Sequence, residues 1–210
     1  MNNMKRYVFF SFCYADVINF RANVVRNSYV TKYGEDTFID GSIWEDAKTK
    51  SPKVIKELID NSGIKNTSVT AVLIGDNTAN RRWINYEIIK SFEQGNGIIG
   101  IFINRIKDKT GHITHKGLNP LDRLALQVSQ DGKKIYFYEL KAGKWHSFKD
   151  LPEVSNKKTN SIYFEDGWFD SDYGKSFYFS ELFETYCWVN DDGYNNISDW
   201  IETAAEQAGR

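Results

Sequence analysis

The sequence has few cysteines, almost no net charge and no long apolar run. Only two of its 210 residues are cysteines, Cys13 and Cys187, too few for a disulfide framework and typical of a reducing compartment. Lys and Arg number 27 against 28 Asp and Glu, so the basic excess of nucleic-acid binders is missing. The longest apolar runs reach about seven residues, far short of a membrane span. We therefore expect a cytoplasmic protein without nucleic-acid or membrane partners.

The first fifteen residues, MNNMKRYVFFSFCYA, resemble a signal peptide in having a basic start and an apolar middle. The apolar part is short and aromatic, is interrupted by Ser11, and contains no leucine or alanine run. We interpret it as a buried first strand.

What the chain does contain is enough apolar material for a core, with 41% hydrophobic and 15% aromatic residues. Up to residue 105, short apolar runs alternate with helical patterns, and one helix is expected to be capped by Asp16. The expected strands are 6–12, 36–40, 68–75 and 97–104, and the expected helices follow Asp16, span 52–61 and span about 80–95. This β-α order predicts a mostly parallel sheet flanked by helices.

Beyond residue 105 the alternation stops. A polar segment over 107–120 is interpreted as a loop or a small hairpin. Residues 133–140 are expected to form a final strand, and residues 142–148 to turn back against it. Residues 175–189 and 196–209 read as two helices around the Asp192-Gly193 turn. We therefore expect one compact unit with a mid-chain insertion and a helical C-terminal extension.

Glu87 is the candidate functional carboxylate, within the segment NRRWINYEIIKSFEQGNG (80–97). It lies roughly 80° from the centre of the helix's apolar stripe and four residues after Trp83, on the same flank. In an open parallel sheet, ligands bind at the carboxyl ends of the strands, and this helix follows such an end. From these residues alone Glu87 is either a solvated surface carboxylate or part of a pocket.

Four segments, in order, resemble TIR domains: VFFSFCYAD (8–16), TFIDGSIWEDAK (37–48), SVTAVLIGDNTANRRWINYEI (68–88) and GNGIIGIFIN (95–104). They match the first strand and its loop, the second strand and mobile BB loop, the third strand with a W-x-x-x-E helix, and the fourth strand. The end of the chain, YCWVNDDGYNNISDWI, is similar to the TIR-like proteins of the Thoeris anti-phage defence system. The sequence departs from TIR domains at two places. SFCYAD lacks the basic residue that many TIR enzymes have soon after the first strand, and GSIWED lacks the proline and glycine run of receptor BB loops.

The resemblance implies a flavodoxin-like α/β fold, with a TIR-like core over 1–145 and an extension over 146–210 that packs on it. It implies cleavage of the nicotinamide–ribose bond of NAD+ and formation of a cyclic ADP-ribose isomer, which activates a partner effector. A phage trigger and self-association on activation are also implied. The alternatives are a hydrolase that gives linear ADP-ribose and a non-catalytic adaptor that acts by TIR–TIR assembly.

The resemblance also assigns the residues of the site. Glu87 is implied as the catalytic carboxylate. The implied NAD-binding residues are Phe10, Ser11, Phe12, Trp44, Asp46, Asn80 and Trp83. No cofactor is expected, because NAD+ is the substrate. No metal is expected either, because His112 and His115 lack a third ligand of obvious spacing.

Overall fold

A parallel sheet forms the middle of the molecule in the computed structural model, which describes residues 6–34, 38–40, 50–156 and 172–210. The sheet has five strands in the order β10-β4-β3-β1-β2. They are β1 (Val8–Ser11), β2 (Phe38–Asp40), β3 (Val69–Ile74), β4 (Gly97–Phe102) and β10 (Thr185–Cys187). Every pairing is parallel. The order is flavodoxin-like, as expected.

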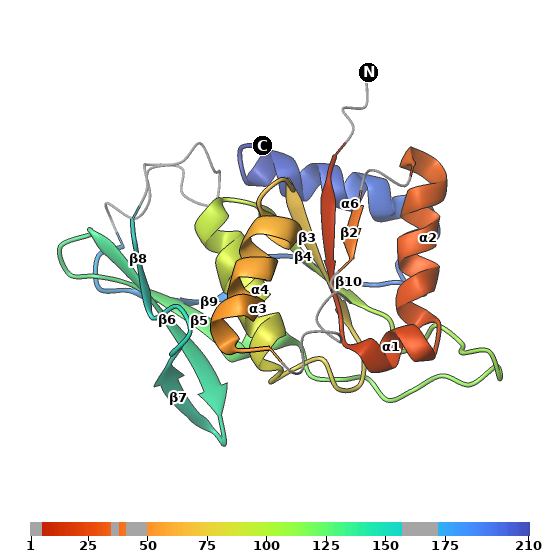
Figure 1. The fold of residues 1–210 in the computed structure, drawn as a ribbon, viewed down its shortest axis with the longest axis horizontal. Helices are drawn as coiled ribbons and strands as arrows, with labels where there is room; N and C mark the ends of the chain where they lie inside the picture. Colours follow the sequence, from red (N-terminus) through yellow and green to blue (C-terminus); the bar gives the residue numbers. More distant parts are fainter. Residues whose placement is uncertain (1–5, 35–37, 41–49, 157–171) are drawn as a thin grey trace.

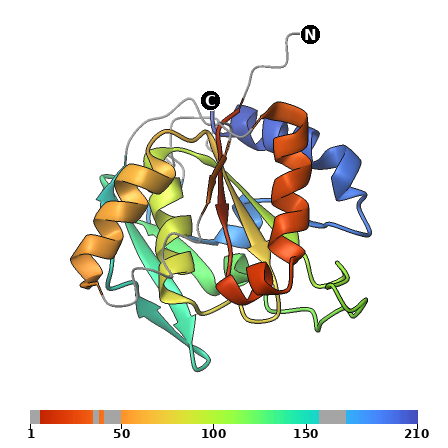
Figure 2. The ribbon, with the colours of Figure 1, turned by 45° about the vertical axis from the view of Figure 1, so that its right-hand side comes forward.

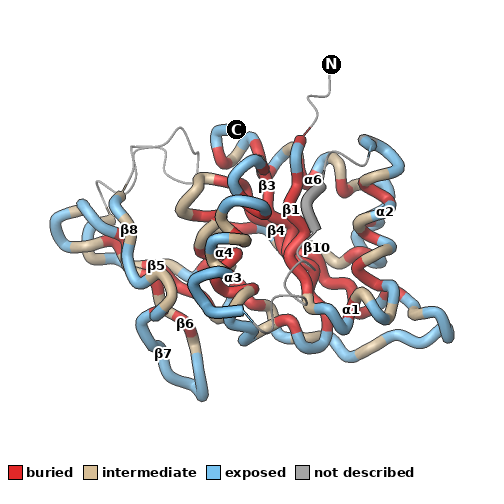
Figure 3. The backbone as a smooth tube through the Cα atoms, viewed as in Figure 1, coloured by how far each residue is buried: buried red, intermediate tan, exposed pale blue. Residues whose placement is uncertain are grey.

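The sheet is buried on both faces, and this explains why its strands are continuous apolar runs. Every residue of β1, β3 and β4 is buried, as Figure 3 shows in red. Successive side chains of β1 enter different cores, because side chains alternate along a strand. Phe9 packs in the core beneath α4, whereas Phe10 packs in the core on the opposite face.

Helices cover both faces of the sheet (Figures 1 and 2). One face carries α2 (Arg21–Tyr33), which follows the short α1 (Tyr14–Ile18), and α6 (Gly193–Gln207). The other carries α4 (Arg82–Gln94) and α3 (Pro52–Leu58), which continues as the π-helical turn η3 (Ile59–Ile64). Gly95 ends α4 with φ of 74°, a left-handed conformation that glycine adopts without strain.

A second, antiparallel sheet packs against α4 and forms a further layer (Figure 1). Its order is β7-β6-β5-β9, with β8 also paired to β6. The phenyl rings of Phe92 on α4 and Phe137 on β6 meet edge to face at 5.8 Å. The elements of this layer are η4 (Pro120–Arg123), β5 (Leu124–Val128), β6 (Lys134–Lys141), β7 (Lys144–Ser147), β8 (Glu153–Ser155), β9 (Ser176–Tyr178) and α5 (Phe179–Leu182).

Several expectations need correction. The strand expected at 133–140 exists as β6, but it belongs to the antiparallel sheet, and β10 is the last strand of the parallel one. The helix expected at 175–189 is wrong: this segment forms β9, the one-turn α5 and β10, so the C-terminal extension is not purely helical. The expected cap Asp16 lies inside α1, whose N-cap is Cys13.

The expected boundary between residues 145 and 146 falls inside β7. Residues after it supply β10 to the edge of the parallel sheet and α6 to one of its faces. Residues before and after the boundary therefore pack within the same layers. Among the described residues, no helix has the length and apolar character needed to cross a membrane.

Candidate active site

The candidate site lies at the carboxyl edge of the parallel sheet, where β1 ends at Ser11 and β3 ends at Ile74. This edge points downward in Figure 1, toward α1 and the start of α4. Ligands of open α/β sheets bind at this edge, outside the strand ends.

Glu87 lies in the second turn of α4 and is only 1% exposed. Ser11, which is fully buried, donates a hydrogen bond from Oγ to Glu87 Oε2 at 2.5 Å. The structure therefore brings these two site residues together, across 76 positions of sequence. The alternative of a solvated surface carboxylate is wrong. Such burial is costly for a carboxylate unless polar groups compensate it, so the position is atypical of a purely structural helix residue.

A buried chain of hydroxyls holds the turn of α4 that carries Glu87. Ser91 donates a hydrogen bond from Oγ to the Glu87 backbone carbonyl at 2.7 Å. The same Oγ lies 2.6 Å from Oγ1 of Thr70 on β3, and both residues are fully buried. These contacts tie the helix to the strand one turn beyond the carboxylate and fix the position of Glu87 relative to Ser11.

Trp83 is half-buried at the start of α4 and already has ring partners. The Arg82 guanidinium lies 4.5 Å from the indole centre, and the Tyr86 ring meets it edge to face at 6.2 Å. Asp150 holds Arg82 in place with hydrogen bonds of 2.7 and 2.8 Å. These bonds lower the pKa of Asp150 below its ordinary value. Any ligand ring would therefore share the indole with Arg82.

Asn80 precedes α4 in a left-handed conformation, with φ of 65°. It is exposed, and its Oδ1 accepts a hydrogen bond from Arg123 Nε at 2.7 Å. The N-cap of α4 is Arg81, so the helix begins close to its expected start near residue 80. Asn80 therefore links the loop after β3 to η4.

The two phenylalanines of the predicted site point away from Glu87. Phe10 and Phe12 both pack in the core on the α2 face, where Phe10 meets Tyr29 edge to face at 6.0 Å. Among the expected residues of β1 and its loop, Ser11 is the one whose side chain reaches Glu87. Trp44 and Asp46 lie outside the described residues.

Asp16, expected only as a helix cap, also lies at this edge of the sheet. It is 5% exposed, and a Cβ at Gly75 would lie 2.3 Å from its carboxylate oxygens. A Cβ at Gly117 would likewise lie 2.0 Å from the Gly75 carbonyl oxygen. Burial raises the pKa of Asp16 to about 6, against a lowering by Arg21. In the sequence, the feature that could have indicated Asp16 as a site residue is its position in the segment SFCYAD, directly after the first strand.

A buried amide and carboxylate connect α4 to the antiparallel sheet. Asn85, two positions before Glu87, donates from Nδ2 to Glu139 Oε2 on β6 at 3.3 Å. Lys141 completes this cluster with an ion pair to Glu139 at 2.5 Å. No group of three metal-binding side chains is found within the described parts of the chain.

The parallel sheet of flavodoxin-like order and the buried carboxylate on the helix after its third strand define a TIR-like domain. The family model of the Thoeris protein ThsB, TIR-like domain, matches residues 9–108, a range that contains Ser11 and Glu87.

The similarity continues through the rest of the chain. A protein of Bacillus cereus (strain MSX-D12) named "Putative cyclic ADP-D-ribose synthase ThsB1" is 51% identical over 200 residues, covering 94% of this chain and 100% of that protein. The chain therefore belongs to the ThsB family of Thoeris TIR-like proteins, which confirms the resemblance.

Proposed function

We propose that this chain is an anti-phage defence enzyme that cleaves the nicotinamide–ribose bond of NAD+ and makes a cyclic ADP-ribose isomer. The observation that carries the proposal is the buried Glu87 carboxylate, hydrogen-bonded to Ser11 at the carboxyl edge of the sheet. The relative named as a cyclic ADP-D-ribose synthase, similar over its whole length, supports the reaction and NAD+ as substrate.

One carboxylate is sufficient for this reaction. The C–N bond breaks with both electrons passing to the pyridinium nitrogen, so nicotinamide leaves as a neutral molecule and needs no general acid. The ribosyl group becomes cationic, as in the transition state of glycoside hydrolysis. In our proposal Glu87 stabilises this cation, because a preoriented charge in a water-poor site acts strongly. Ser11 holds the carboxylate in position.

Cyclisation requires an internal nucleophile to capture the cation before water does. A hydroxyl of the same substrate attacks, the new C–O bond forms, and the hydroxyl proton is released. A tethered nucleophile has a high effective concentration, and exclusion of water favours it further. We propose that Trp83 and Asn80, at the start of α4, help to hold the substrate in this folded arrangement. We also retain Phe10, Phe12, Trp44 and Asp46 as proposed NAD-binding residues, with support from the family resemblance only.

The remaining parts of the proposal also follow from the family. The product activates a partner effector, a phage component triggers synthesis, and self-association completes the active state. We propose a cytoplasmic location, which the two unpaired thiols of Cys13 and Cys187 support. No resident cofactor is proposed.

The proposal is tested in cells that express the full chain, with and without phage infection. Lysates of infected cells are expected to release nicotinamide from added NAD+ and to contain an ADP-ribose isomer that mass and chromatography distinguish from linear ADP-ribose. Glu87→Gln is expected to lower nicotinamide release at least 100-fold, because it removes the charge that stabilises the cation.

The matched control is Glu93→Gln, on the same helix outside the site, which is expected to retain activity. Unchanged release by Glu87→Gln would reject the assignment of the carboxylate. Linear ADP-ribose as the main product would indicate a hydrolase, and no release by the wild type under infection would favour an adaptor.

A further inference from the structure

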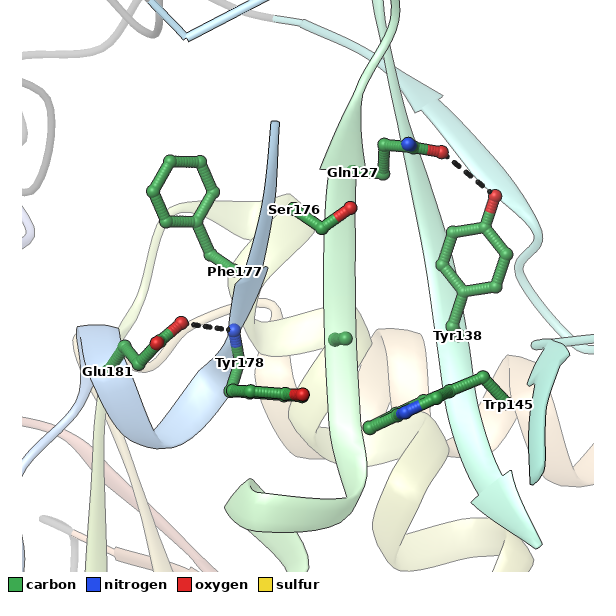
Figure 4. Close-up of a pocket in the computed structure, with 8 residues that line it drawn as sticks. Gln127, Tyr138, Trp145, Ser176, Phe177, Tyr178 and Glu181 are labelled. Atoms are coloured by element: carbon green, nitrogen blue, oxygen red, sulfur yellow. Dashed lines mark hydrogen bonds between the residues drawn. The ribbon is translucent and has the colours of Figure 1, made fainter. Parts of the chain in front are cut away.

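A pocket lies on the antiparallel sheet, and none of its lining residues belongs to the Glu87 site. Its volume is about 430 Å³, within the range of about 300–1,000 Å³ that is typical of small-molecule sites. It opens on the outer face of the sheet (Figure 4). The residues that line it are Ala125, Gln127, Tyr138, Trp145, Ser176, Phe177, Tyr178 and Glu181.

The strand register explains how the hollow forms. Ala125 on β5 pairs with Tyr138 on β6 and with Tyr178 on β9, so a methyl group lies between two tyrosines in one row of the sheet. Ala125 is 7% exposed and forms the floor. The larger side chains on either side of Ala125 form the walls.

Two aromatic rings form one wall of the pocket. The ring centroids of Trp145 on β7 and Tyr178 on β9 lie 5.6 Å apart with planes 31° apart, so the two side chains meet over β6 and β5, the strands between them. Figure 4 shows both rings edge-on at one end of the pocket, with Gln127 and Ser176 toward the other end. Trp145 and Tyr178 are 38% and 46% exposed, so the faces of their rings are accessible to a ligand.

Polar groups lie opposite the rings. Gln127 and Ser176 form the next pair in the same register, and two residues along a strand advance by about 7 Å. That spacing leaves room for one flat ring stacked on the aromatic wall. Tyr138 donates a hydrogen bond to Gln127 Oε1 at 3.2 Å, which fixes the amide.

The charge of the pocket selects against phosphate. Glu181 is the charged residue among the described lining residues, and none of them is basic. Its carboxylate is held at the pocket by the Tyr178 backbone N–H, which donates to it at 2.7 Å. Amide, hydroxyl and carboxylate oxygens accept hydrogen bonds from amino groups, whereas the carboxylate repels a phosphate.

We propose that this pocket binds a planar heteroaromatic ring that carries an amino group and no phosphate, such as the base of a purine nucleoside. The ring stacks on Trp145 and Tyr178, with its opposite face toward Gln127 and Ser176 and its amino group toward Glu181. The proposal concerns a site separate from Glu87 and does not depend on the reaction proposed there.

The test is calorimetric titration of the purified full chain with adenosine. Trp145→Ala and Tyr178→Ala are each expected to weaken binding about tenfold, the usual effect of removing one stacking partner of a base. Trp145→Phe, which keeps a ring, is expected to lose less. Ala125→Val is expected to block the floor while leaving both rings in place. Denaturant unfolding of each variant verifies the fold.

Two controls separate this pocket from other sites. Tyr194→Ala removes an exposed aromatic residue on α6, and Glu87→Gln alters the candidate active site; both are expected to bind adenosine like the wild type. Absence of adenosine binding at millimolar concentration would overturn the proposal. So would binding that survives both ring deletions.

Two matched probes test the chemistry of the ligand. Purine riboside, which lacks only the amino group of adenosine, is expected to bind several-fold more weakly. Adenosine monophosphate is also expected to bind more weakly, because its phosphate meets Glu181 and no cation. Equal affinity for purine riboside would overturn the role of the amino group, and tighter binding of the monophosphate would overturn the exclusion of phosphate.

Discussion

The parallel and antiparallel sheets differ in how much of each strand is buried. Every residue of β3 and β4 is buried, whereas β6 alternates between buried and half-exposed residues and β7 is exposed throughout. The first pattern is typical of parallel sheets covered on both sides, and the second of antiparallel sheets with one wet face. The same contrast separates the two sites: Glu87 is 1% exposed, whereas Tyr178 is 46% exposed. The parallel sheet supplies a dry environment for charge, and the antiparallel sheet supplies an accessible stacking surface.

Alanine substitutions at consecutive residues of one strand should show the difference in burial between the two sheets most clearly, through the free energy of unfolding. Phe9 and Phe10 on β1 are both fully buried, so Phe9→Ala and Phe10→Ala should each lower the free energy of unfolding by about 3–5 kcal/mol. On β6, Phe137→Ala should cost a similar amount, because Phe137 is fully buried beneath the sheet. Tyr138→Ala, on the wet face, should cost about 1 kcal/mol or less. Urea denaturation measures all four changes.

The informative quantity is the difference between neighbours on one strand. A small difference on β1 and a large one on β6 would support the contrast. If Tyr138→Ala cost as much as Phe137→Ala, then the outer face of the antiparallel sheet would be covered in solution and the contrast would fail.

The next largest effect on stability is expected at Asp16, a buried carboxylate at the edge of the parallel sheet. Its pKa of about 6 in the folded protein exceeds the ordinary 3.8, so the folded state binds the proton more tightly than the unfolded state. Wild-type stability should therefore fall as the pH rises from about 4 to about 6. Asp16→Asn removes the buried charge, so it should raise the free energy of unfolding at pH 7 by at most about 3 kcal/mol.

The pH dependence distinguishes this cause from a packing change. The gain from Asp16→Asn should shrink as the pH falls toward 4, because wild-type Asp16 is then neutral as well. Asp76→Asn, at an exposed neighbour, should change stability by less than about 0.5 kcal/mol. A gain from Asp16→Asn that is the same at pH 4 and pH 7 would show that burial of charge is not its source.

The parallel sheet could be predicted from the sequence because burial on both faces makes each strand a continuous apolar run. The segments SVTAVLIG and GIIGIFIN contain β3 and β4 within two residues of their observed ends. β10 could not be found this way. It is three residues long, and its place is set by pairing of Thr185 with Gly100, which lies far away in the sequence. Aromatic residues around it also fit a helical spacing, which led to the wrong helix.

The site was partly predictable for similar reasons. Alternation along β1 places Ser11 on the opposite face from Phe10 and Phe12, so strand geometry explains why Ser11 reaches Glu87 and the two phenylalanines do not. The raised pKa of Asp16 could not be predicted, because its cause is burial against Gly75 in the folded chain. The aromatic pocket also depends on the pairing of β5 with β6 and β9, which the sequence did not reveal.

The smallest effect is expected from the removal of one hydroxyl group from each sheet. Its effect on kcat compares the two environments directly. Ser11 donates to the Glu87 carboxylate at 2.5 Å in a buried site, and Tyr138 donates to the Gln127 amide at 3.2 Å on the wet face. Hydrogen bonds to charged groups contribute about 1.5–3 kcal/mol, and neutral ones about 1 kcal/mol or less when water can replace them. Ser11→Ala should therefore lower the kcat of nicotinamide release about tenfold, whereas Tyr138→Phe should leave it within about twofold.

The matched variant is Ser11→Thr, which keeps a hydroxyl at the same strand position and should recover most of the lost rate. A fall in kcat with little change in KM would indicate that Ser11 orients Glu87 rather than binds NAD+. If Ser11→Ala left kcat unchanged while Glu87→Gln abolished it, then the carboxylate would be held by the α4 contacts alone. The hydroxyl chain through Ser91 and Thr70 would then be the next set of contacts to remove, because it fixes the same turn of the helix to β3.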